Sequence, residues 1–422
     1  MLLSVSMTDT FLVGHLGQVE LGVIGLADQF VTLANMLFSA VGIASVAVIA
    51  RATGASADPA PANRSLGQSI LLALIVGVSA LLACQLLAPF LMWAMGARGE
   101  VAEAGARFFR LVSLGFPFAS LMLVGNASLR GSGNTVVPMR ISLIYSCVNI
   151  SVAWILVRGL DPIPALGLTG TALARIIGYS VGGLMTTSVL VWGHGRLRLR
   201  LSGLRPDLRE IKRLLRIAMP AVAEEVLMRL GHLAFVRFVV GLGTTALAAH
   251  TLVVNAQSLP YMPGAAFGVA SAALVGQSLG AGQPERARRV GYHASVWSAA
   301  VMGLFGMVFA LFPEWVIGLF TQDPDVVAMA TGALRVSALM QVPMAILTVF
   351  TSSLRGAGDT RGPMVINGLG LWLFRVPLGL VVGVLLRGQV IHMWGVVVFD
   401  MTLRGLLSWL RFHDRRWQHV RV

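Results

Sequence analysis

The sequence contains one ten-residue motif twice, as NASLRGSGNT at residues 126–135 and as TSSLRGAGDT at residues 351–360. The copies agree at six positions, and a Pro-Met pair follows each at equal distance, at Pro138–Met139 and Pro363–Met364. The offset of 225 residues is about half of the 422-residue chain, so it indicates a duplicated half and not a short solenoid repeat. Repeated apolar halves are typical of secondary transporters, whose binding site lies between the repeats.

A second repeated stretch supports the duplication. VAVIARATGA (46–55) and AALVGQSLGA (272–281) lie 226 residues apart, and each ends an apolar segment. A Leu-Gly pair precedes each of these segments, at Leu16–Gly17 and at Leu242–Gly243. The sequence therefore predicts two homologous halves of six helices each.

The composition is that of a membrane protein. The chain is 56% hydrophobic and 12% charged, with a mean hydropathy of +0.80, whereas soluble proteins carry about a quarter charged residues. Both cysteines, Cys84 and Cys147, lie in apolar runs, which disfavours a disulfide framework. The net charge is +14, but the basic residues form neither a basic domain nor a patch with interleaved aromatic residues. We therefore expect them in positively charged loops of a membrane protein, and we expect no nucleic-acid partner.

Twelve apolar segments can be drawn, so we expect an all-α integral membrane protein. They lie near residues 1–14, 21–50, 66–93, 105–129, 138–158, 168–192, 216–241, 246–278, 290–318, 330–354, 362–386 and 390–411. A link at 193–215 with seven basic residues divides them into an N-terminal lobe (1–192) and a C-terminal lobe (216–422). Arginine is concentrated in alternate loops, which predicts a multi-pass protein of the plasma or inner membrane with both termini in the cytoplasm.

The first segment is short for a membrane span. Fourteen helical residues cover about 21 Å, whereas the hydrocarbon core is about 30 Å thick. We therefore expect a truncated first helix. A cleaved signal peptide is the competing interpretation, but no charged n-region follows Met1 and no small-residue cleavage site is evident.

Several stretches resemble the multidrug and toxic compound extrusion (MATE) family, and most closely its DNA-damage-inducible-F (DinF)-like branch. They are TDTFLVGHLG (8–17), SLRGSGNTVVP (128–138), LGTTALAAH (242–250), VGQSLGAGQPERA (275–287) and SLRGAGDTRGP (353–363). The resemblance implies two six-helix lobes around a central cavity. It also implies export of organic, mostly cationic, compounds in exchange for H⁺ or Na⁺ by alternating access, with no other cofactor.

Asp9 is the first candidate for ion coupling. It lies in an apolar run between Thr8 and Thr10, and an ionised carboxylate there is costly unless it faces protein or water. The resemblance implies that a first-helix aspartate and the asparagine at Asn149 couple transport to the ion. The family pattern has a second aspartate where this chain has Ala153. The alternative for Asp9 is a helix-end aspartate bonded to local amides.

Glu224 is the second candidate. It follows Pro220, which removes one hydrogen bond of the predicted helix and can expose a carbonyl to a cavity. Glu225 and Arg229 are four residues apart and could form an ion pair, whereas Glu224 has no such partner on its own helix. We therefore assign ion coupling to Glu224 and a structural role to Glu225. The alternative is that both lie near the cytoplasmic end of the helix.

Four residues are candidates for the substrate cavity. Asp28 and Asn35 follow a polar stripe of the second segment, together with Gly25 and Thr32. Tyr145 and Tyr261 could stack on a flat organic cation. For each of the four, packing against a neighbouring helix is the alternative.

Further charged residues lie within apolar segments. Asp400 and Arg404 are four residues apart and predict a structural ion pair. Arg175 and Arg375 could anchor helix ends or neutralise carboxylates on other helices.

Two other functions are alternatives to an antiporter. A flippase of lipid-linked oligosaccharides on the same fold would use cavity arginines such as Arg175, Arg237 and Arg375 to hold pyrophosphate. An enzyme is disfavoured, because we find no metal-spaced Cys/His set and no Ser-His-Asp arrangement. We expect a monomer in the lipid bilayer that binds small-molecule organic cations.

Overall fold

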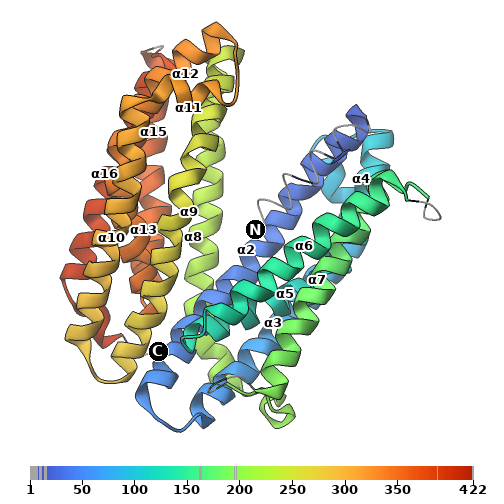
Figure 1. The fold of residues 1–422 in the computed structure, drawn as a ribbon, viewed down its shortest axis with the longest axis vertical. Coiled ribbons are helices and arrows are strands. Elements are labelled where there is room, and N and C mark those ends of the chain that lie inside the picture. The colour runs from blue at the N-terminus through green and yellow to red at the C-terminus, as the bar shows by residue number, and fades with distance from the viewer. Residues whose placement is uncertain are drawn as a thin grey trace. The chain divides into compact units, whose positions relative to one another are not determined.

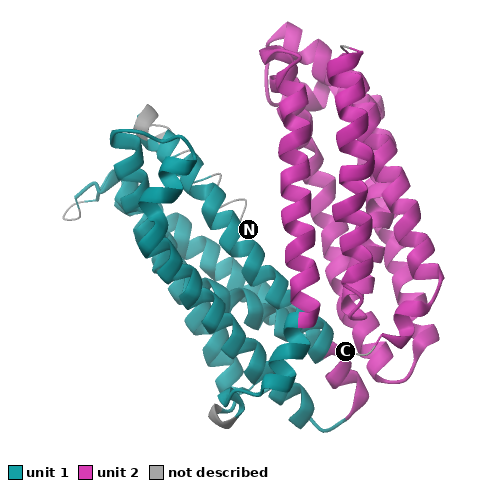
Figure 2. Cartoon of the chain, turned by 180° about the vertical axis from the view of Figure 1, so that it is seen from behind, with its two compact units in different colours: residues 1–49, 57–215 teal, residues 50–56, 216–422 magenta. Residues whose placement is uncertain are grey.

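The computed structural model describes residues 8, 12–13, 17–160, 164–193, 195, 197–386 and 388–420. In these ranges the chain is a series of long helices joined by short turns, and it contains no β-strand (Figure 1). The chain divides into two compact units (Figure 2). Unit 1 comprises residues 1–49 and 57–215, and unit 2 comprises residues 50–56 and 216–422.

Unit 1 is built from five complete helices and parts of two others. They are α3 (Ala60–Ala94), α4 (Glu100–Ser113), α5 (Phe116–Gly131), α6 (Val136–Arg158) and α7 (Gly167–Trp192), with most of α2 (Gln18–Ala55) and the first residues of α8 (Leu208–Val240). Helices α4 and α5 meet at a bend of 48° and together pass as one broken span. The short 3₁₀ helix η1 (Leu201–Leu204) lies in the basic link, which belongs to this unit.

Unit 2 contains the rest of α8 and a second series of helices. Its first part holds α9 (Thr244–Gly280), α10 (Pro284–Leu311), α11 (Pro313–Gly318), α12 (Pro324–Ser337), η2 (Ala338–Met340) and α13 (Gln341–Gly356). Its second part holds α14 (Arg361–Pro363), η3 (Met364–Leu369), η4 (Leu371–Arg375), α15 (Val376–Leu380), η5 (Val381–Leu385), α16 (Val390–His413) and η6 (Arg416–His419). η3, η4 and η5 are π-helical turns, which are rare and recur at functional sites.

The spans agree with the sequence prediction. Within the described ranges, nine helices are long and apolar enough to cross a membrane, or ten if α4 and α5 form one span. Helix α8 is also long enough, but it carries too many charged residues to pass the same test. The predicted first segment lies mostly outside the described residues. The protein is therefore an all-α integral membrane protein.

Each unit has its own apolar core. In unit 1, Phe38 and Phe116 pack edge to face with ring centroids 5.9 Å apart. In unit 2, Phe412 stacks between Phe350 and Trp417 at centroid distances of 4.8 and 4.5 Å. Many large apolar side chains remain exposed, as on α3, where Leu86 is 78% exposed. Such surface is expected where lipid, and not water, surrounds the helices.

The second repeated stretch forms a close helix contact inside unit 2. Residues 50–55 end α2, and their counterparts end α9. A Cβ atom added to Gly54 would lie 2.0 Å from the carbonyl oxygen of Gln277, and one added to Gly280 would lie 2.1 Å from that of Arg51. The two copies thus contact each other reciprocally, through glycines that let the backbones approach.

Candidate functional site

The carboxylate of Glu224 lies in the interior of unit 2. Its residue on α8 is only 2% exposed. Oε1 accepts a hydrogen bond of 2.5 Å from Nη2 of Arg355, on α13, and one of 2.6 Å from Nδ2 of Asn367, on η3. Three elements therefore converge on this carboxylate. Among the described residues, Glu224 has no ion-pair partner on its own helix. Its partner is Arg355, the arginine of the second copy of the Ser-Leu-Arg-Gly (SLRG) motif, at residues 353–356.

Two oxygen atoms of this cluster have no hydrogen-bond partner among the described residues. They are Oε2 of Glu224 and Oδ1 of Asn367, and both are buried. A buried acceptor without a partner is costly, so a native structure that keeps one needs an explanation such as a bound ion or water. Carboxylate and amide oxygens are suitable ligands for a hard cation, and the carboxylate can also accept a proton.

Glu225 and Tyr261 complete the surroundings of Arg355. Both interact electrostatically with its guanidinium, and Glu225 also interacts with Glu224. The cluster of Glu224, Glu225 and Arg355 therefore has one more negative than positive charge when both acids are ionised. Tyr261, on α9, is 47% exposed.

A second buried charge cluster lies in the same unit. Arg404 donates to both oxygens of Asp400, from Nε at 2.9 Å and from Nη2 at 2.6 Å, as the i,i+4 spacing predicted. Arg375, on η4, adds an ion pair of 2.8 Å to the same carboxylate, so it does neutralise an acid on another helix. Asp400 and Arg404 are completely buried.

His232 was not singled out from the sequence, yet it contacts this second cluster. Its Nδ1 lies 2.7 Å from the carbonyl oxygen of Met228, and its Nε2 lies 3.3 Å from Nη1 of Arg375. An imidazole that donates from Nδ1 to a carbonyl and accepts at Nε2 from a guanidinium is neutral. No local pattern marks this role, because both partners depend on how α8 and η4 pack.

In unit 1, Asp28 on α2 forms an ion pair with Arg175 on α7. The guanidinium of Arg175 also lies over the Phe108 ring, 5.9 Å from its centroid. Arg175 therefore neutralises a carboxylate on another helix, one of the two roles that the sequence allowed. The side chain of Asp28 is 24% exposed, and its place in a substrate cavity stays a prediction.

Tyr145 and Asn149 lie side by side on α6. Tyr145 is 2% exposed and stacks on Tyr179 with ring centroids 5.4 Å apart, so its ring packs within the unit 1 core. Asn149 is fully buried against Gly178, and neither atom of its amide has a hydrogen-bond partner in the described ranges. The Asn149 amide is therefore a buried polar group in unit 1 that could accept or donate a further hydrogen bond.

The partner proposed for Asn149 is Asp9, which lies outside the described residues. Leu12, three residues further on, packs in a buried apolar cluster with Ala153 of α6 and Ala174 of α7. The pairing of Asp9 with Asn149 stays a prediction. Asn35 is half-buried on α2, and its proposed contact with substrate also stays a prediction.

The fold and the polar clusters define a multi-pass membrane protein with buried charges, as expected of a transporter. The family model MatE matches residues 1–155 and again residues 220–381, once in each half. The chain belongs to the MATE family of transporters.

Relatives match over nearly the whole chain. The multidrug resistance protein NorM of Burkholderia vietnamiensis is 31% identical, over 97% of this chain and 90% of the relative. The probable multidrug resistance protein NorM of Thermotoga maritima is 28% identical, over 98% and 88%. In structure the chain resembles the D35N mutant of the Vibrio cholerae MATE transporter VcmN, with a TM-score of 0.90 at 21% identity, over 98% of this chain and 92% of that one. It also resembles a crystallised MATE in its straight conformation, with a TM-score of 0.91 at 20% identity, over 98% and 92%.

Proposed function

We propose that this protein is a secondary active multidrug efflux antiporter, which exports organic cations in exchange for H⁺ or Na⁺. The observation that carries the proposal is the pair of buried, unpartnered oxygens on Glu224 and Asn367. A proton or a sodium ion could bind to these oxygens inside unit 2. The site lies beside Arg355, whose guanidinium is the only one that contacts Glu224 in the described ranges. The names of the NorM relatives support drugs as the cargo.

The proposed coupling follows from the charge of the Glu224 cluster. A proton on Oε2 would neutralise the carboxylate and weaken its attraction to Arg355, whereas Na⁺ would use Oε2 and Asn367 Oδ1 as ligands. Either ion drives transport only if its affinity differs between the inward-facing and outward-facing states. An organic cation near Glu224 or Glu225 would be repelled by the bound ion, so cargo and ion would exclude each other.

The proposed setting is the plasma or inner membrane, with both termini in the cytoplasm. The basic link and the other arginine-rich loops support this orientation. Asp28, Asn35, Tyr145 and Tyr261 remain the proposed substrate contacts. Tyr261 has the best support, because it is half-exposed and interacts electrostatically with Arg355, whereas the ring of Tyr145 is buried against Tyr179.

The ion pairs in the structure weaken the case for a flippase. Such a protein needs cationic side chains free to hold pyrophosphate, yet Arg175 pairs with Asp28 and Arg375 pairs with Asp400. Arg237 is the third arginine that a flippase could use to hold pyrophosphate. It lines a pocket of about 1360 Å³ that also contains the carboxylate of Asp325.

Transport in reconstituted vesicles tests the proposal. Uptake of a fluorescent organic cation would be driven by an imposed pH gradient and, separately, by a Na⁺ gradient. We expect Glu224→Gln to abolish driven uptake and Glu225→Gln, a matched loss of one charge at the next residue, to keep most of it. Unchanged uptake by folded Glu224→Gln protein would refute the role of Glu224.

The variant Asp9→Asn distinguishes ion coupling at Asp9 from ion coupling at Glu224. If Asp9→Asn abolishes driven uptake while Glu224→Gln does not, the coupling ion is bound in the first half of the chain. Thermal unfolding gives a second readout, since a ligand that binds only the folded state raises its stability. Na⁺ or acidification should raise the melting temperature of the wild type more than that of Glu224→Gln.

A further inference from the structure

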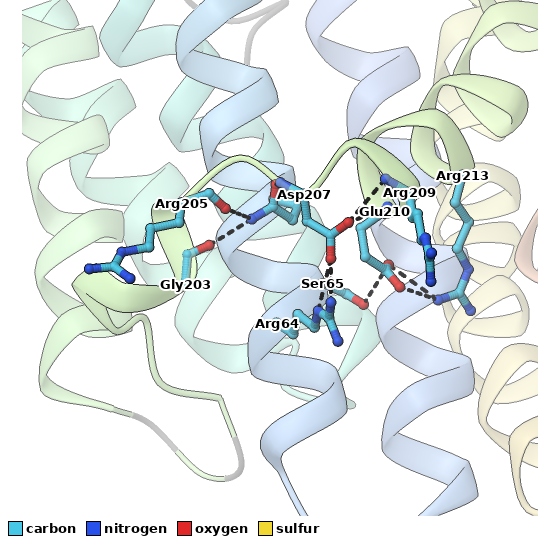
Figure 3. A network of polar contacts seen from close by, with 9 residues as sticks. Arg64, Ser65, Gly203, Arg205, Asp207, Arg209, Glu210 and Arg213 are labelled. Atoms are coloured by element: carbon cyan, nitrogen blue, oxygen red, sulfur yellow. Dashed lines mark hydrogen bonds and ion pairs between the residues drawn. The ribbon is translucent and has the colours of Figure 1, made fainter.

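The basic link (residues 193–215) is held against the N-terminal part of α3 by hydrogen bonds (Figure 3). Gln68 is 1% exposed, and its Nε2 donates hydrogen bonds of 2.8 Å to the carbonyl oxygens of Gly203 and Arg205. Its Oε1 accepts a bond of 2.9 Å from the backbone N–H of Asp207. A Cβ atom on Gly67 would lie 2.3 Å from the Gly203 oxygen, so this contact needs glycine. The link therefore has a defined shape over residues 203–207.

The acids of this region are already paired. Asp207 forms an ion pair with Arg64, and its Oδ1 accepts a bond of 3.0 Å from the backbone N–H of Arg209 at the start of α8. The hydrogen bond from Arg64 holds the pKa of Asp207 below its ordinary value, so this carboxylate is ionised near neutral pH. Glu210 pairs with Arg213 at 3.1 Å.

Two arginines are left with uncompensated charge. Arg205 and Arg209 lie on either side of Asp207 in Figure 3, and their side chains make no ion pair with any residue that the structure describes. Both are exposed. Together with Arg64, Gln68 and Asp207 they line a pocket of about 640 Å³. The pocket thus has a net positive charge, and the buried Gln68 amide is part of its lining.

The same pocket has an apolar edge. Leu208 lines it and is 79% exposed, although it lies between charged residues. Trp192, which ends the membrane-spanning helix α7 just before the link, is 80% exposed. Exposed tryptophan at the end of a span is typical of the membrane–water interface. The link that carries the pocket therefore begins at the end of a span, where phospholipid headgroups are expected.

We propose that this pocket binds the headgroup of an acidic phospholipid, with its phosphate at the guanidinium of Arg205 or of Arg209, which extend to opposite sides of Asp207 in Figure 3, and its acyl chain along Leu208. Clusters of arginine and lysine next to a span attract anionic lipids, by an amount that grows with each cation. Guanidinium groups also bind phosphate oxygens in a bidentate manner.

Native mass spectrometry of the full-length protein in detergent tests the proposal. Short-chain phosphatidylglycerol and phosphatidylcholine with identical chains are titrated separately, and the fraction of protein with bound lipid is measured. We expect phosphatidylglycerol to bind at least about tenfold more tightly, and Arg205→Gln/Arg209→Gln to remove that preference. Arg286→Gln/Arg289→Gln is the matched control, since it removes two exposed charges from the first turns of α10 in unit 2.

The outcomes decide between a specific site and general attraction. Equal binding of both lipids, or an equal loss in the Arg286/Arg289 control, would overturn the proposal. Leu208→Ser should weaken phosphatidylglycerol binding severalfold. Inorganic phosphate is the third arm: if it displaces the lipid at comparable concentration, the pocket is a site for free anions and the lipid assignment is wrong.

Discussion

The two copies of the SLRG motif have the same backbone but different electrostatic surroundings. In both, a serine hydroxyl bonds to a serine of a neighbouring helix, at 2.7 Å for Ser128 with Ser45 and at 2.6 Å for Ser353 with Ser271. In both, the second glycine after the arginine has a positive φ, +94° at Gly133 and +90° at Gly358. The turn geometry has therefore been kept since the duplication.

The arginines of the two motifs differ. Arg355 is bonded to the buried carboxylate of Glu224, whereas Arg130 makes no ion pair with any described residue. The charges also differ further along: Arg175 of α7 and Asp400 of α16 stand 225 residues apart, at equivalent positions of the two halves. Both side chains are buried and both form an ion pair, but Arg175 is the cation of its pair whereas Asp400 is the anion of its own. The duplicated framework thus carries two different polar interiors, and unit 2 has the denser one.

The largest effect should come from the Asp400 cluster. Asp400→Asn leaves Arg375 and Arg404 without a carboxylate in a fully buried site, which should cost about 3–5 kcal/mol of unfolding free energy. Asp28→Asn is the matched change in unit 1. It leaves one buried arginine, Arg175, without its carboxylate instead of two, and Asp28 itself is partly exposed, so the loss should be smaller, about 2–3 kcal/mol. Thermal unfolding in detergent, followed by tryptophan fluorescence, measures both. Equal losses would contradict the difference between the units.

The two motif arginines give the next comparison. Arg355→Ala strands the carboxylate of Glu224 in the interior and should cost about 3 kcal/mol. Arg130→Ala removes no ion pair among the described residues, so it should cost about 1 kcal/mol or less. The double variant Arg355→Ala/Glu224→Gln should recover part of the loss, whereas an additive loss would mean that the two side chains are not coupled.

The shared backbone predicts equal effects. Gly133→Ala and Gly358→Ala each force a side chain into a positive φ and should each cost about 1–2 kcal/mol. Unfolding midpoints of the two variants, measured side by side, should agree. A much larger loss at one site would show that the two turns are not equivalent.

The smallest effect concerns the exposed pair of Asp207 and Arg64. The pKa of Asp207 is lowered in the folded state by the hydrogen bond from Arg64, so its stabilising contribution is present above the unfolded pKa of about 3.9 and is lost as the pH falls through the lower folded value. The melting temperature of the wild type should therefore exceed that of Asp207→Asn slightly above pH 5, and the difference should shrink below pH 4. A difference that grows on acidification would reverse the sign of this linkage.

The sequence predicted more of the fold than of the site. The repeated motifs indicated the duplication, and the lengths of the apolar runs indicated the spans from the second to the last. The i,i+4 spacing indicated the Asp400–Arg404 pair. Glu224 was found as a candidate, since it follows a helix-interior proline, Pro220, by four residues. Its partners Arg355 and Asn367 were not, because they lie on α13 and η3, more than 130 residues away.

The sequence by itself determined that this protein is a duplicated membrane bundle of the MATE type. Apolar length, the placement of arginine and the repeated turns are local properties, and the bilayer leaves helices few other arrangements. Only the tertiary structure decided which buried charges meet: Glu224 with Arg355, Asp28 with Arg175, and Asp400 with two arginines. The reason is physical, since the rotation of each helix about its axis, which sets where a charge points, is fixed by packing against its neighbours.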